Sequence, residues 1–225
     1  HRQFDRLQSY FSDEMTIETV VTAPYELSGL KCDMILSTLP ITADVPVVFI
    51  SNFISNTDRQ AISDVIRRLK AGREKERLLG LLQTLIDAEL FTPSASYNDR
   101  ESAIRAIGET MRSHGIISQE FIESALEREN ISPTNFGLIA IPHPSDCRAT
   151  RSAIAVSLLR RPLLWGTSNV RIIFMISVSK SDLSDFSDIF SYLPRVCSDY
   201  KNLEQLASAS CYEEFIRILG NICAE

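Results

Sequence analysis

The sequence contains few of the residues that build metal sites and disulfide frameworks. Its three histidines are far apart, and its five cysteines form no Cys-x-x-Cys pair. Such spacing argues against a structural zinc site. An odd number of cysteines, in a chain where we identify no signal peptide, indicates reduced thiols in a cytoplasm. We therefore expect a cytoplasmic protein with no bound metal and no cofactor.

An excess of positive charge and long apolar runs are also missing. The formal net charge is -6 and the pI is near 5.2, so the long-range field would repel a phosphate backbone. No apolar run approaches the ~20 residues that span a bilayer. The chain is 44% hydrophobic and 23% charged, which is typical of folded globular proteins. We expect a soluble protein that touches neither nucleic acid nor membrane.

The N-terminal part alternates short apolar runs with helical patterns. Residues 33–37 and 45–51 are each typical of a short strand, and the pattern Thr57-Asp-Arg-Gln60 predicts a helix start by a capping box. After Gly72, residues 74–86 predict a second helical stretch. This alternation favours a small parallel α/β unit followed by a helical connector.

From about residue 88 the pattern restarts and indicates a mixed α/β or α+β domain. Asn98 and Ser118 are expected to cap two helices, and Gly115 to end the first of them. Residues 161–166 suggest a turn anchored by the single tryptophan, Trp165, which we expect to pack in the core. Further strands are expected at 138–142, 153–159 and 170–178, and helices after Ser181, at 200–209 and after the capping box at 210–213.

The candidate site lies where the apolar run before His143 stops at an imidazole and a turn. A lone histidine at a strand end can be a core residue, a metal ligand, an acid/base group or a nucleophile. Arg128 precedes it by fifteen positions, and Arg148 and Arg151 follow, while Ser145 lies in the turn itself. A cationic neighbourhood of this kind suits a phosphoryl group better than a divalent metal.

Three separated motifs resemble one known family. They are Leu126-Glu-Arg128-Glu-Asn-Ile-Ser-Pro-Thr, Ile139-Ala-Ile-Pro-His143 and Arg161-Pro-Leu-Leu-Trp-Gly. In this order and spacing they are similar to the fructose/mannitol-type enzyme IIA domain of the bacterial sugar phosphotransferase system. The resemblance implies that His143 accepts a phosphoryl group from the phosphocarrier protein HPr and that Arg128 clamps it. Ser145, Arg148 and Arg151 would form the neighbourhood of the phosphate.

The N-terminal part is similar to the later portion of a galactitol-type enzyme IIB domain. The likeness rests on Cys32-Asp-Met-Ile-Leu-Ser-Thr-Leu-Pro40, on the run Val45-Pro-Val-Val-Phe-Ile-Ser51 and on the helix that follows. The first strand and phosphocysteine loop of that family would lie before His1, and Cys32 is not that cysteine. We expect a partial IIB-like domain at 1–56, a helical connector at 57–87 and an enzyme IIA-like domain at 88–225.

One departure from the family favours regulation over transport. Members that pass phosphate to a transport IIB domain carry a second histidine after the strand matched by 170–178, and Leu183 stands there. This arrangement resembles the C-terminal region of transcriptional activators and antiterminators controlled by the phosphotransferase system. The implied partners are HPr and the DNA-binding and regulation domains of the same polypeptide. The alternative is a working enzyme IIA that passes phosphate to IIB domains for sugar uptake.

Overall fold

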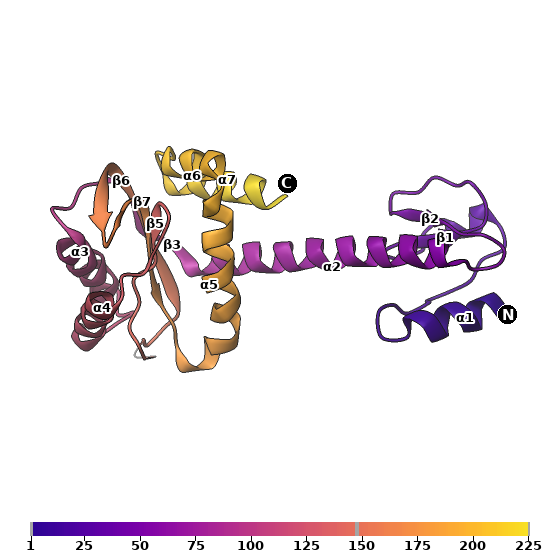
Figure 1. Cartoon of the computed structure of the whole chain (residues 1–225), viewed down its shortest axis with the longest axis horizontal. Coiled ribbons are helices and arrows are strands. Elements are labelled where there is room, and N and C mark those ends of the chain that lie inside the picture. Colours follow the sequence, from indigo (N-terminus) through magenta and orange to yellow (C-terminus); the bar gives the residue numbers. More distant parts are fainter. Residues whose placement is uncertain (1, 147–148, 225) are drawn as a thin grey trace. The chain divides into compact units, whose positions relative to one another are not determined.

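The computed structural model describes residues 2–146 and 149–224 and divides into two compact units (Figure 1). One unit ends at Glu74 and the other begins at Lys75. The first holds a two-stranded parallel sheet and the second a mixed five-stranded sheet, so the expected α/β class is confirmed. None of the helices in the described ranges is long and apolar enough to cross a membrane.

The N-terminal unit is built on a short parallel strand pair. Strands β1 (Ile35–Ser37) and β2 (Val47–Phe49) pair in parallel, as the alternating pattern predicts. Helix α1 (Arg2–Phe11), the 3-10 turn η1 (Pro24–Leu27) and the first part of α2 (Asn56–Leu85) complete the unit. The buried core comprises Leu7, Phe11, Val48, Ile50, Ile62, Val65 and Ile66.

A hollow of about 780 Å³ lies beside this small core. It is lined by the β-branched segment 15–22, which forms no strand in the described part of the chain, and by residues around β1. Apolar side chains border it, yet Met34 and Leu36 are only half-buried and Val20 is exposed. The N-terminal unit therefore leaves much of its apolar surface uncovered.

The start of α2 differs in detail from the expected capping box. The reciprocal bonds join Ser55 and Asp58: Ser55 N donates to Asp58 Oδ2 at 2.8 Å, and Asp58 N donates to Ser55 Oγ at 3.1 Å. The helix then continues through Gly72 without a break, so the two expected helical stretches are one helix. A single glycine costs a helix only about 1 kcal/mol relative to alanine, and strong helix formers surround it.

The C-terminal unit is organised around a five-stranded sheet of order β3-β6-β7-β5-β4. The strands are β3 (Ile86–Ala95), β4 (Asn135–Phe136), β5 (Ile139–Ala140), β6 (Ala153–Trp165) and β7 (Ser168–Ser177). β3 runs parallel to β6, β6 antiparallel to β7, and β5 parallel to β7. The C-terminal ends of β5 and β7 and the N-terminal end of β6 therefore lie at the same end of the sheet.

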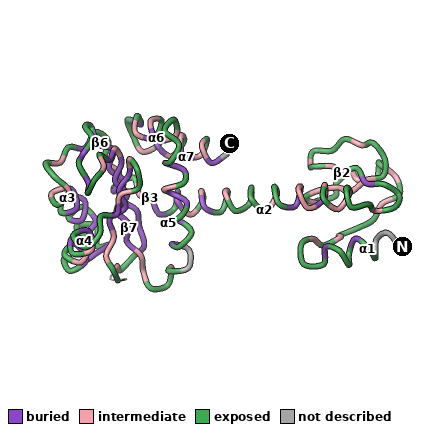
Figure 2. Tube along the Cα trace, viewed as in Figure 1, coloured by how far each residue is buried: buried purple, intermediate pink, exposed green. Residues whose placement is uncertain are grey.

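Helices cover both faces of this sheet (Figure 1). α3 (Arg100–Ser113) and α4 (Gln119–Ile131) pack on one face. On the other lie the last turns of α2, α5 (Leu183–Ser198), α6 (Tyr200–Ala207) and α7 (Tyr212–Ala224), with the short turn η2 (Lys180–Asp182) before α5. Figure 2 shows burial concentrated on the strands and the helix faces turned toward them. Alternation along β7 sends Phe174 to the α5 face and Met175 to the α3 face.

Three local expectations in this unit were wrong. Residues 161–165 belong to β6, and the chain turns only at Gly166 (φ +62°), although Trp165 is buried as expected. Asp99, one residue after the expected Asn98, caps α3 through Ser102 N at 2.7 Å. At α7, Ser210 donates to Glu214 instead of Glu213.

Candidate functional site

His143 lies just beyond the C-terminal end of β5, a strand whose side chains alternate between the two faces of the sheet. Backbone pairing extends past β5, because Ile176 N donates to the Pro142 carbonyl at 3.1 Å and Ile141 N donates to the Thr134 carbonyl at 3.0 Å. Ile139 and Ile141 are buried toward α5. His143 follows Ile141 by two positions and is half-buried at the mouth of the sheet.

The contacts of the His143 ring determine which nitrogen can react. Nδ1 lies 2.7 Å from the Ile141 carbonyl oxygen. A carbonyl oxygen can only accept, so we assign the proton to Nδ1, and the neutral ring then carries its lone pair on Nε2. The Phe190 ring of α5 lies against the imidazole, with centroids 4.8 Å apart at 59°. His143 is thus held in one orientation, with the lone pair of the neutral ring on Nε2.

Burial and neighbouring charges tune the basicity of this imidazole. Burial is the main cause that lowers the pKa of His143 below its ordinary value of 6.5. The bond to the Ile141 carbonyl opposes this shift, the charge of Arg128 adds to it, and the charge of Glu129 opposes it. The lowered pKa keeps the ring neutral at pH 7, which a nitrogen nucleophile requires.

Arg128 approaches the site from the last turn of α4. Its Nη1 donates to the Ser132 carbonyl at 2.7 Å, where the helix ends, and the side chain is half-buried. Its guanidinium is close enough to His143 to lower the pKa of that imidazole. The charge of Arg128 therefore acts on the imidazole of His143, while its guanidinium is bound to the end of α4.

The structure describes two of the three weaker candidates, Ser145 and Arg151. Ser145 is exposed in the turn after His143. Arg151 is exposed and forms an ion pair with Asp87, with Nη2 and Oδ2 3.5 Å apart. Arg148 lies outside the described residues. In residues 2–146 and 149–224, no three His, Cys, Asp or Glu side chains are grouped so as to hold a metal ion.

Sequence reasoning missed Glu129, the neighbour of Arg128. Its side chain is fully buried and accepts from Thr134 N at 3.0 Å, from Thr134 Oγ1 and from Trp165 Nε1 at 2.8 Å. Its position was readable, because it continues the buried helical spacing of Ile122, Ala125 and Leu126. A carboxylate at a core-facing position needs donors, and that need was the available signal.

A cluster of serine side chains around Asp182 lies at the same end of the sheet, where β7 ends and β6 begins. Asp182 Oδ2 accepts from Ser152 Oγ at 2.5 Å and from Ser179 Oγ at 2.8 Å, and Ser181 Oγ donates to Oδ1 at 2.9 Å. These bonds, Ser152 first, lower the pKa of Asp182. Leu183 follows as the first residue of α5, is 53% exposed, and stands two turns before Phe190.

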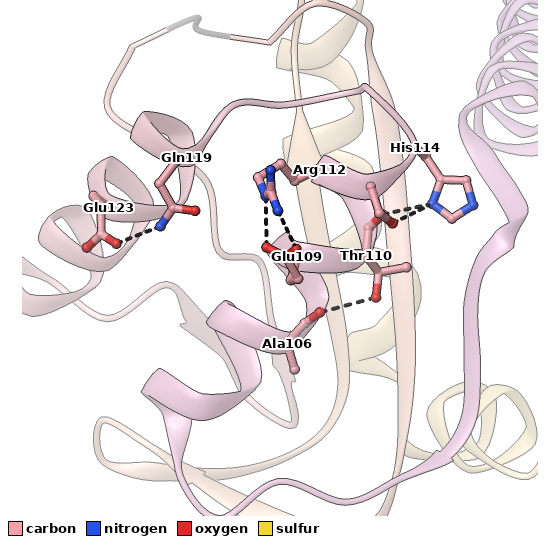
Figure 3. A network of polar contacts seen from close by, with 8 residues as sticks. Ala106, Glu109, Thr110, Arg112, His114, Gln119 and Glu123 are labelled. Atoms are coloured by element: carbon pink, nitrogen blue, oxygen red, sulfur yellow. Dashed lines mark hydrogen bonds and ion pairs between the residues drawn. The ribbon is translucent and has the colours of Figure 1, made fainter.

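His114 lies apart from this site, at the end of α3. Its Nδ1 lies 2.8 Å from the Thr110 carbonyl and its Nε2 lies 3.2 Å from Glu89 Oε2. Figure 3 shows the ring turned toward Thr110, separate from the Glu109–Arg112 pair. Gly115 follows with φ +68°, as expected of a glycine that ends a helix. Both ring nitrogens of His114 are engaged in structural contacts.

Relatives with known names include operon regulators and enzyme IIA components. The probable licABCH operon regulator of Bacillus subtilis is 28% identical over 217 residues, which are 93% of this chain and 32% of the regulator. The chain thus spans about a third of that protein's length. The mannitol-specific phosphotransferase enzyme IIA component of the same organism is 28% identical over 130 residues, covering 56% of this chain and 89% of the relative.

Solved structures share the fold of the C-terminal unit. The nitrogen regulatory protein IIA-Ntr from Neisseria meningitidis matches 62% of this chain and 99% of its own, with a TM-score of 0.57 and 20% identity. IIA mannitol from Escherichia coli matches 59% and 97%, with a TM-score of 0.53 and 22% identity. The family model for "Phosphoenolpyruvate-dependent sugar phosphotransferase system, EIIA 2" matches residues 84–222, more than half of the chain. The protein therefore belongs to the EIIA type 2 family of the sugar phosphotransferase system.

Proposed function

We propose that this region is a regulatory phosphotransferase module in which His143 accepts a phosphoryl group from HPr. The observation that carries the proposal is the contact between His143 Nδ1 and the Ile141 carbonyl oxygen. Nδ1–H is tied to the Ile141 carbonyl, and the lowered pKa keeps Nε2 unprotonated at neutral pH. A neutral, oriented imidazole is what an in-line attack on phosphorus requires.

In the proposed transfer, one N–P bond forms as another breaks. The Nε2 lone pair of His143 attacks phosphorus, the new N–P bond forms, and the N–P bond to the donor histidine of HPr breaks with its electron pair returning to that imidazole. Nδ1 keeps its proton. Arg128 acts by turning from the Ser132 carbonyl to the equatorial phosphoryl oxygens, where its charge is favoured.

The product carries a new negative charge at the sheet edge, about -1.5 to -2 by analogy with other phosphorylated side chains. The relatives that cover most of the chain include an operon regulator three times its length, which supports a signalling role within a larger polypeptide. We propose that DNA-binding and regulation domains of that polypeptide respond to this charge. The N-terminal unit, by its resemblance, is a partial IIB-like domain, with α2 linking it to the enzyme IIA-like domain.

The test is incubation with phosphoenolpyruvate, enzyme I and HPr, followed by quantification of acid-labile label. His143→Ala should take up no label, whereas the matched variant His114→Ala should label as the unmodified protein does. Arg128→Ala should label slowly, and Arg128→Lys should recover part of the rate. Full labelling of a folded His143→Ala variant would refute the assignment.

Leu183 separates the regulatory role from the alternative role in sugar uptake. A leucine offers no donor, acceptor or charge for onward transfer, and Asp182 beside it would repel an incoming anion. In a chase with IIB domains bearing their cysteine, the label should stay on His143 or return to HPr. Rapid, complete transfer to the IIB cysteine would instead establish a transport component.

A further inference from the structure

The buried carboxylate of Glu129 is not explained by packing alone. It is 0% exposed, and its two oxygens are surrounded by donors from two elements: the backbone and hydroxyl of Thr134 and the indole N–H of Trp165. An ionised carboxylate in a core is tolerated only when such donors replace water. An apolar residue would fill the same helix position without needing any of them, so the arrangement indicates a use for the charge.

Hydrogen bonds lead from this carboxylate to the imidazole. Thr134, held at its N–H and hydroxyl by Glu129, offers its carbonyl to Ile141 N at 3.0 Å. The carbonyl of Ile141 in turn accepts from His143 Nδ1 at 2.7 Å. Ile141, whose carbonyl orients the imidazole, is thus fixed through its own N–H by the segment that Glu129 anchors.

The same carboxylate also fixes the segment that contains Ser132, to which Arg128 is bound. Arg128 donates to the Ser132 carbonyl, within the short segment between α4 and Thr134 that Glu129 closes by its bonds. The Glu129 carbonyl also accepts from Arg100 Nη1 at 3.1 Å, which ties the end of α4 to α3. Glu129 therefore fixes the backbone segments that hold both Arg128 and His143.

We propose that Glu129, with Trp165 and Thr134, is a positioning residue for phosphoryl transfer that holds His143 in its Nδ1–H tautomer. The transfer itself rests on the proposed function, whereas the tautomer is a property of the resting protein. This makes Glu129 more than a structural residue: removing its charge should loosen the Thr134–Ile141 segment and so change the chemical state of a ring that it does not touch.

The experiment measures tautomer and transfer separately. Long-range ¹H–¹⁵N NMR spectra of the resting protein give the tautomer of His143, with His114 as an internal reference. Glu129→Gln, which places N–H donors against the donors of Thr134 and Trp165, should convert the single Nδ1–H signal of His143 into a mixture. The rate of labelling at saturating HPr should fall by about 10- to 100-fold, by analogy with the loss of residues that orient metal-binding histidines.

Two further variants keep the test decisive if Glu129→Gln does not fold. Trp165→Phe keeps an aromatic ring but removes the indole donor, and Thr134→Val removes only the hydroxyl donor; each should shift the tautomer in the same direction, by less. Ile104→Val is the matched control, because Ile104 is fully buried in the same core cluster as Trp165 and should leave the tautomer unchanged.

Two results would overturn the inference. One is a folded Glu129→Gln variant whose His143 keeps the pure Nδ1–H signal and labels at the normal rate. The other is a tautomer change in Ile104→Val as large as that in Trp165→Phe, which would mean that any core disturbance has this effect. Failure of the unmodified protein to accept label would refute the proposed function, and the NMR arm would still decide the role of Glu129 on the imidazole.

Discussion

The two units of this chain contain sheets of the same general class but differ in how completely those sheets are covered. The five-stranded sheet of the C-terminal unit has a helical layer on each face, and its central strands are buried on both. The N-terminal sheet has two strands of three residues, one small cluster of buried side chains and a hollow beside it. Two-stranded sheets have little stability of their own, so tertiary cover decides the difference.

That comparison teaches where a reactive side chain can be held. His143 is oriented because its strand is fixed by β7, by Thr134 and by the Phe190 ring. The half-buried side chains of the N-terminal strand pair have no such surroundings. Burial is the main cause of the lowered pKa of His143, and this burial comes from layers on both sides of the strand end.

The largest contrast should come from deleting one aromatic ring in each unit. Phe215 is fully buried, with ring centroids 5.3 Å from Phe91 and 6.5 Å from Phe174, so Phe215→Ala should cost about 3–5 kcal/mol in free energy of unfolding. Phe11→Ala should cost about 1–3 kcal/mol, because half-exposed neighbours can collapse around the gap. Urea unfolding of both variants measures the difference. Equal costs would show that the core of the N-terminal unit is as well packed as that of the C-terminal unit.

A smaller contrast should come from two glycines in left-handed conformations. A Cβ on Gly166 (φ +62°) would lie 2.9 Å from Pro133 Cβ, whereas one on Gly29 (φ +83°) would meet nothing within 4 Å. Gly29→Ala should therefore cost about 1–2 kcal/mol from backbone strain alone. Gly166→Ala should cost about 1 kcal/mol more because Pro133 must also move. Thermal unfolding measures both, and a larger loss for Gly29→Ala would contradict this reading of the two turns.

Mildly acidic pH should lower the free energy of unfolding of the C-terminal unit because His143 becomes protonated. The folded-state pKa of His143 lies below 6.5, so between pH 6.5 and that value the unfolded chain binds more protons than the folded one. Stability is therefore unaffected above pH 6.5 and falls as pH decreases through this window. His143→Gln should reduce the slope of stability against pH there, as measured by urea unfolding at several pH values. An unchanged slope would exclude His143 as its source.

The smallest effect should be on the N-terminal unit, at lower pH. Bonds from the Ser51 hydroxyl and from Ser55 lower the pKa of Asp58 to about 2. Because this folded pKa lies below the unfolded value of 3.8, the stabilisation is complete above pH 3.8 and is lost as pH falls through about 2. Asp58→Asn should remove part of this acid sensitivity, as measured by far-ultraviolet circular dichroism of the whole chain.

Periodicity predicted most elements of the fold because it reports local burial. The three strands of the C-terminal core and the helices around them follow alternating or helical spacing. The turn expected at 161–166 was wrong because strand β6 continues through Pro162. It lies where the β6–β7 register shifts between Leu158 and Leu163, and an irregular ladder tolerates a residue that has no N–H.

The site was predictable only where its chemistry is local in sequence. His143 and its strand could be read from one short stretch, and Arg128 from a motif that resembles the family. The Trp165 donor to Glu129 lies 36 positions downstream, and Phe190 reaches His143 from a helix beyond two further strands. Such pairs depend on strand order, which no local pattern encodes. The segment 15–22 shows the reverse: its composition favours a strand, but a strand also requires a neighbour.

The single tryptophan gives this chain an optical probe at the centre of its site region. Trp165 is fully buried, with its indole N–H bound to the Glu129 carboxylate, and the sequence contains no other indole. Its emission should be blue-shifted and shielded from iodide and acrylamide quenchers in the folded protein. Fluorescence therefore follows only the C-terminal unit, whereas far-ultraviolet circular dichroism follows both. A difference between the two unfolding curves would resolve the two units without any label.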